Sequence, residues 1–170
     1  EVVEKFGSFS GNETITVSGN AVVANIYASG EGYSGSTKYE GTKANAYLDG
    51  NVTINMEGGT VTGNVYGGGK GIAAEGYEQC ARVTKDSKVE DNIAGGIVKG
   101  NVYGGGDVAD VLGSASVALS GGTVRGKVFG GGKVSDVEGS TSVTLSGATV
   151  QGNLYGGGEE GTVKGSTTVN

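Results

Sequence analysis

The 170-residue sequence contains no proline, no histidine and no tryptophan, and it has a single cysteine. Without proline or a Gly-X-Y register the chain is not a collagen, although 37 of its residues are glycine. The lack of histidine excludes enzymes that need an imidazole as base, nucleophile or metal ligand. Cys80 has no second cysteine with which to form an intrachain disulfide.

Positive charge and long apolar runs are also scarce. Lysine and arginine total 12 against 18 acidic residues, which gives a net charge of −6. This balance argues against nucleic acids and anionic membranes as partners, because both reward clustered basic side chains. No apolar run approaches the roughly 20 residues of a membrane span. We therefore expect neither nucleic-acid binding nor membrane insertion.

Internal repeats organise the sequence. Four segments match closely: GGTVTGNVYGGG at 58–69, GGIVKGNVYGGG at 95–106, GGTVRGKVFGGG at 121–132 and GATVQGNLYGGG at 147–158. A weaker copy, GNAVVANIYASG, lies at 19–30, and a second element typified by GSTSVTLSGA at 139–148 also recurs. The aromatic positions are 39, 37, 26 and 26 residues apart, so the basic unit has 26 residues and the first two intervals carry insertions.

Within each unit the apolar residues alternate with period two, which is typical of strands and not of helices. In TVRGKVF, Val124, Gly126 and Val128 share one face, and a further short strand runs through the valines at 111, 137 and 163. The pattern predicts an all-β fold: a single-stranded parallel β-helix, or solenoid, of about five to six coils with three short strands per coil. Coils stack about 4.8 Å apart in such a fold. We expect residues 1–170 to form one domain.

Stacked coils place equivalent residues in columns. The predicted core columns are Val124 with Val150, Val128 with Leu154, Leu119 with Leu145, and Val117 with Val143 and Val169. A glycine column (Gly63, Gly100, Gly126 and Gly152) is predicted to face inward. Because glycine has no side chain, this column predicts a narrow cross-section in which opposite walls approach closely.

The GGTVxGxVYGGG unit followed by GSTSVTLS resembles glycine-rich repeats of large, surface-exposed, adhesin-like β-helix proteins of anaerobic bacteria. The resemblance covers almost all of residues 11–170. It implies an extracellular or cell-surface stalk, adhesin or fibre, and it implies an architecture more than an activity. The chain departs from the pattern in its two insertions and in its first unit, which lacks the Gly-Gly-Gly run.

A column of aromatic residues is the most informative outward feature. It comprises Tyr27, Tyr66, Tyr103, Phe129 and Tyr155, which alternation directs away from the core. Such a column either stabilises the coils by stacking or forms an interaction stripe for sugar rings or a protein. The insertions at 30–49 and 70–88 fall on one side of the solenoid and bring candidate contact residues Tyr33, Tyr39, Tyr47 and Tyr77. They face a partner or cover the aromatic column.

Parts of the sequence also match three other functions. Asp110 and Asp136 are equivalent on adjacent coils and resemble the carboxylate pair of a glycoside hydrolase, but Thr162 replaces them in the next coil, so turn capping is the alternative. The column of Thr60, Thr123 and Thr149 suggests an ice-binding face, although Ile97 interrupts it. Acidic residues after the Gly-Gly-Gly runs suggest calcium, but the column reads Asp107, Lys133, Glu159, and the lysine breaks it.

The ends of the solenoid complete the prediction. Residues 1–10 are a possible N-terminal cap, whereas the other end stops mid-repeat with Thr167, Thr168 and Val169 as a candidate assembly edge. We expect a non-catalytic, extracellular structural or adhesive protein without a cofactor: a segment of a longer repeat array or a subunit that stacks head to tail into a fibre. Glycans or cell-surface proteins are possible partners. A carbohydrate-binding or carbohydrate-active protein and an ice-binding solenoid are the alternatives.

Overall fold

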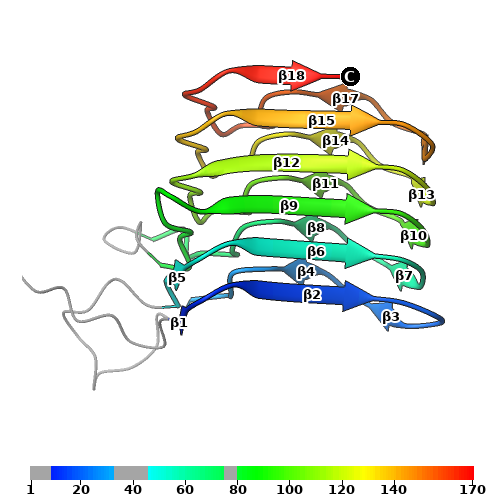
Figure 1. The fold of residues 1–170 in the computed structure, drawn as a ribbon, viewed down its shortest axis with the longest axis horizontal. Coiled ribbons are helices and arrows are strands. Elements are labelled where there is room, and N and C mark those ends of the chain that lie inside the picture. The colour runs from blue at the N-terminus through cyan, green and yellow to red at the C-terminus, as the bar shows by residue number, and fades with distance from the viewer. Residues whose placement is uncertain (1–8, 33–45, 75–79) are drawn as a thin grey trace, which may run out of the picture.

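The fold is a parallel β-solenoid. A computed structural model describes residues 9–32, 46–74 and 80–170. All regular secondary structure in these residues is β-strand, and no helix is present among them. Every strand pairs in parallel, so the coils lie one above another from β2 to β18 (Figure 1). The predicted all-β parallel solenoid is confirmed.

One side of the solenoid is a six-stranded sheet, the wide sheet, in the order β2-β6-β9-β12-β15-β18. Its strands are Glu13–Val17, Val52–Met56, Lys88–Ile93, Ser114–Leu119, Thr141–Leu145 and Thr167–Val169. In β12, Ala115, Val117 and Leu119 are buried, whereas the residues between them are not. The strand therefore turns alternate side chains inward and outward, as the period-two pattern predicts.

Two further sheets have five strands each, all of two residues. The middle sheet contains β3 (Val22–Val23), β7 (Thr60–Val61), β10 (Ile97–Val98), β13 (Thr123–Val124) and β16 (Thr149–Val150). The aromatic sheet contains β4 (Ile26–Tyr27), β8 (Val65–Tyr66), β11 (Val102–Tyr103), β14 (Val128–Phe129) and β17 (Leu154–Tyr155). The prediction of one continuous strand through TVRGKVF is therefore wrong, because residues 125–127 form a corner between β13 and β14.

The glycine at this corner allows successive coils to approach closely. A Cβ atom on Gly126 would lie 2.3 Å from Oδ1 of Asn101 and 2.4 Å from the carbonyl oxygen of Gly100. Both neighbours belong to the corner of the preceding coil, and the same holds for the glycines at 63, 100 and 152. The prediction that this glycine column brings opposite walls together is thus wrong. The glycines instead allow the corners of successive coils to pack closely along the solenoid axis.

The remaining side is held by single bridges. Leu48, Val83, Val111, Val137 and Val163 pair successively in parallel. This column contains the predicted short strand through the valines at 111, 137 and 163. At its base, β1 (Phe9–Ser10) pairs with β5 (Leu48–Asp49). The last residues of both predicted insertions, 48–49 and 83–88, therefore belong to the coils, and of the predicted cap only residues 9 and 10 lie within the described ranges.

An aliphatic core runs along the solenoid axis and confirms the predicted columns in the central coils. Val117, Leu119, Val124, Val128 and Val143 are all buried in one cluster. At the end of the stack the columns become accessible: Val150 and Leu154 only pack against the cluster, Leu145 is 37% exposed and Val169 is 48% exposed. These residues are accessible because no described coil lies above them.

Candidate interaction surfaces

The aromatic side chains form one continuous stack along the solenoid. Neighbouring rings lie nearly parallel, with centroids 4.9, 4.9, 5.1 and 4.9 Å apart from Tyr27 to Tyr155. In-register pairing of the aromatic sheet sets this spacing, because each ring sits directly above its counterpart. The predicted stacking is confirmed.

The rings are buried, however, so most of the predicted interaction stripe is not accessible. Tyr66, Tyr103 and Phe129 are at most 3% exposed and form a cluster separate from the aliphatic core. Tyr155, in the last coil, is 38% exposed. Side chains that follow the glycine runs lie near the rings: the Lys70 ammonium is 5.9 Å from the centre of the Tyr27 ring. The expectation of an exposed aromatic stripe is wrong for the three central rings.

An asparagine two residues before each tyrosine ties the stack to the backbone. Nδ2 of Asn64, Asn101 and Asn153 donates to the hydroxyl of the tyrosine in the same coil, at 3.0, 2.8 and 3.0 Å. Oδ1 of the asparagines at 25, 64 and 101 accepts a backbone N–H of the next coil, at 2.8 Å in each case. In the coil of Phe129, which has no hydroxyl, Lys127 replaces the asparagine. One side chain thus satisfies the tyrosine and joins two coils.

Charged residues four positions after each aromatic residue form a column of alternating sign: Glu31, Lys70, Asp107, Lys133 and Glu159. Lys70 pairs with Glu31, and Nζ of Lys133 lies 3.1 Å from Oδ1 of Asp107. The hydrogen bond that the Lys133 ammonium donates to Asp107 raises the pKa of that ammonium. The Tyr103 hydroxyl donates to Glu159 at 2.7 Å. Lys133, which breaks the acidic column considered for calcium, therefore serves as the ion-pair partner of Asp107.

The two aspartates considered for glycoside hydrolysis bond to the backbone. Oδ1 of Asp110 accepts the N–H of Asp136 at 2.9 Å, and Oδ1 of Asp136 accepts the N–H of Thr162 at 2.8 Å. Arg82 also pairs with Asp110. Both carboxylates cap the next coil, as the alternative interpretation predicts. In the described part of the chain no group of three or more His, Cys, Asp or Glu residues is placed to hold a metal ion.

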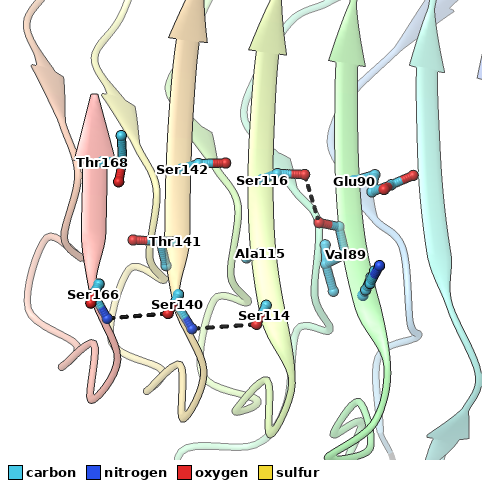
Figure 2. Close-up of a pocket in the computed structure, with 11 residues that line it drawn as sticks. Val89, Glu90, Ser114, Ala115, Ser116, Ser140, Thr141, Ser142, Ser166 and Thr168 are labelled. Carbon is cyan, nitrogen blue, oxygen red and sulfur yellow. Dashed lines mark hydrogen bonds between the residues drawn. The ribbon is translucent and has the colours of Figure 1, made fainter. Parts of the chain in front are cut away.

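The outer face of the wide sheet carries small polar side chains in rows. One row follows the strand pairing through Thr14, Thr53, Glu90, Ser116, Ser142 and Thr168. A shallow groove of about 400 Å³ lies on this face, and Figure 2 shows the serines that line it. Oγ of Ser114 accepts the N–H of Ser140 at 3.3 Å, and Oγ of Ser140 accepts the N–H of Ser166 at 3.2 Å.

The predicted threonine column lies on a different face, that of the middle sheet, which has five strands against six in the wide sheet. There Ile97 pairs with Thr60 on one side and with Thr123 on the other, so the interruption expected from the sequence is present. Thr149 follows in β16. In the sequence, the alternating serines and threonines of GSTSVTLS indicated which residues of the wide sheet point outward. They did not show that these residues line up in rows across six strands.

Asp91 is a buried residue that sequence reasoning missed. Its Cα pairs with Ile54 on one side and Val117 on the other, and its side chain is 0% exposed. Neither carboxylate oxygen has a hydrogen-bond partner in the described structure. Burial therefore raises the pKa of Asp91 well above its ordinary value. The segment DSKVEDNIAGG is an imperfect repeat, and that irregularity was the signal available in the sequence.

The two ends of the described stack differ in exposure. At the first coil, a groove of about 480 Å³ is lined by partly exposed residues, among them Ile15, Val23 and Tyr27, and by the buried Val17 and Ile26. At the other end, β18 is the edge strand of the wide sheet, and all three of its residues, the predicted assembly edge of Thr167, Thr168 and Val169, are exposed. The structure thus places these three residues at an edge, and their role in assembly stays a prediction.

The loop tyrosines are only partly described. Tyr33, Tyr39 and Tyr77 lie outside the described residues, whereas Tyr47 lies just before β5, and Phe9 donates its N–H to the Tyr47 carbonyl at 2.9 Å. Cys80 is buried. The described residues contain no helix long and apolar enough to cross a membrane. The chain matches no protein-family model, no curated protein and no solved structure.

Proposed function

We propose that this chain is a non-catalytic structural segment of an extracellular fibre or stalk, in which further β-coils cover both of its ends. One observation carries the proposal: the last coil exposes the columns that the central coils bury, and the first coil leaves Ile15, Val23 and Tyr27 partly accessible. Val143 is 0% exposed and Tyr103 is 1% exposed, whereas Val169 and Tyr155, their counterparts in the last turn, are 48% and 38% exposed. Covering such apolar surface stabilises a stack by about 25 cal/mol per Å².

The polar chemistry of the coils supports a structural role. Polar side chains of three kinds accept a backbone N–H group of the following coil. They are the asparagines of the aromatic corner, Asp110 and Asp136, and Ser114 and Ser140. Each repeat thus carries its own side-chain links along the axis, as a one-dimensional array requires. The resemblance of the repeats to surface-exposed adhesin-like proteins supports an extracellular position.

Immunoelectron microscopy tests the extracellular position. Antibodies raised against the purified chain are expected to label intact cells of the organism that encodes it, on filaments or stalks. Antibody absorbed with the chain beforehand is the control. Labelling that requires permeabilised cells would contradict the proposal.

A second assay tests the absence of catalysis. The purified chain is incubated with polysaccharides, and the release of reducing ends is followed. We expect none above background. Release that Asp110→Asn or Asp136→Asn abolishes would show that the carboxylate pair is catalytic, and it would favour the carbohydrate-active alternative.

A further inference from the structure

We propose that the exposed face of the last aromatic and middle strands, residues 147–159, is a docking site for one half-coil of the same repeat type. This half-coil supplies one strand to the middle sheet and one to the aromatic sheet, with a lysine four positions after its aromatic residue. The inference rests on the proposed function, in which further coils cover the ends, and it specifies what the covering unit must contain.

The second glycine of each Gly-Gly-Gly run shows where a covering coil is needed. A Cβ atom on Gly68, Gly105 or Gly131 would lie 2.6 to 2.7 Å from a backbone nitrogen of the next coil. At Gly157 the same Cβ atom would meet nothing within 4 Å. The described coils therefore do not require a glycine at position 157, although the repeat retains one there. A further coil stacked on this face would require it.

Two backbone N–H groups on the same face lack a neighbouring strand in the described structure. In the aromatic sheet the N–H of Val128 donates to the Asn153 carbonyl at 2.9 Å, and that of Gly130 to the Tyr155 carbonyl at 2.8 Å. The equivalent N–H groups of Leu154 and Gly156 point to the side on which the described residues place no coil. A half-coil in register would supply both carbonyl acceptors.

Charge specifies the lysine. Each described ion pair in the charge column joins an acid to a lysine one coil later, Glu31 to Lys70 and Asp107 to Lys133. Glu159 is the next acid of this column, and no lysine of the described coils pairs with it. A lysine at the equivalent position of the docking half-coil continues the alternation.

The first coil of another copy does not meet these requirements. Its residue at the charge position is Glu31, which would place two carboxylates side by side. Its first strand, β2, would also need the place that β18 occupies, because the wide sheet has six strands whereas the middle and aromatic sheets have five each. Strand counts and charge thus favour a half-coil of a repeat array over a head-to-tail contact between identical chains.

Extending the chain tests the proposal. A copy of residues 119–133, which contains Phe129 and Lys133, is fused directly after Asn170, where it continues the register of the wide sheet. We expect the melting temperature to rise by about 5 °C. In hydrogen exchange, the amides of Leu154 and Gly156 should exchange at least about tenfold more slowly, because they become paired. The matched control carries glutamate in place of the copy of Lys133 in the appended segment, and it should gain less.

A single substitution distinguishes docking from a general effect of added chain. Gly157→Ala should leave the melting temperature of the unextended chain unchanged, and it should remove most of the gain in the extended chain. An extension that changes neither melting nor exchange, or a gain that survives Gly157→Ala, would overturn the proposal. An unextended chain that sediments as an oligomer with protected Leu154 and Gly156 amides would also overturn it, since a second copy would then be the occupant. These outcomes are independent of the cell-labelling test.

Discussion

Asp91→Val should stabilise the protein, although it removes an acidic side chain. Asp91 occupies a core column between Ile54 and Val117, and its carboxyl group has no hydrogen-bond partner among the described residues. Valine already fills the equivalent position one coil later, so the backbone accepts it. Removing an unsatisfied buried polar group recovers about 1–3 kcal/mol.

The gain should depend on pH with a defined sign. Because burial raises the pKa of Asp91 above its ordinary value of 3.8, the folded chain holds a proton that the unfolded chain releases. As pH rises from about 4 to the raised pKa, the wild type therefore loses about 1.4 kcal/mol of stability per pH unit relative to the valine variant. The advantage of the variant is smallest below pH 4 and larger at pH 7.

Thermal unfolding followed by circular dichroism between pH 4 and pH 8 measures both effects, at about 2–4 °C per kcal/mol for a chain of this size. Asp91→Asn separates them: it removes the ionisation and its pH dependence but keeps a polar group in the core. Glu90→Val, on the exposed neighbouring position, is the control and should change the pH dependence little. A valine variant that melts below the wild type, or an asparagine variant with an unchanged pH dependence, would refute the reasoning.

Two further predictions concern links within and between coils. Asn101→Ala should cost about 1–3 kcal/mol in urea unfolding, because it deletes a donor to the buried Tyr103 hydroxyl and an acceptor for the N–H of Lys127. Lys127→Ala, one coil later in the same column, should change stability by less than about 0.5 kcal/mol. Equal losses in the two variants would contradict the role of the asparagine in linking the coils. Val124→Asp should abolish the cooperative melting transition by placing an unpaired charge in the core, whereas Arg125→Ala on the exposed corner should leave it nearly unchanged.

The architecture could be predicted from the sequence because the fold repeats. Equal residues at a fixed spacing experience equal surroundings, so the alternation around Val117 and Val143 predicts the core face of every wide-sheet strand. The same logic predicted the stacked rings, since an aromatic residue at one position of each unit must lie above its counterpart. The equivalence of Asp110 and Asp136 on adjacent coils placed them in one column, but it left both a hydrolase pair and turn capping open.

Tertiary structure decided what the repeat pattern does not encode. Whether Phe129 is exposed depends on the segments folded beside it, and alternation within its own strand carries no information about them. The isolation of Asp91 depends on residues in neighbouring coils, which the imperfect repeat around it does not specify. Periodicity determines which residues share a column. The contacts at the ends and edges of that column determine which of them are buried, paired or left open to a partner.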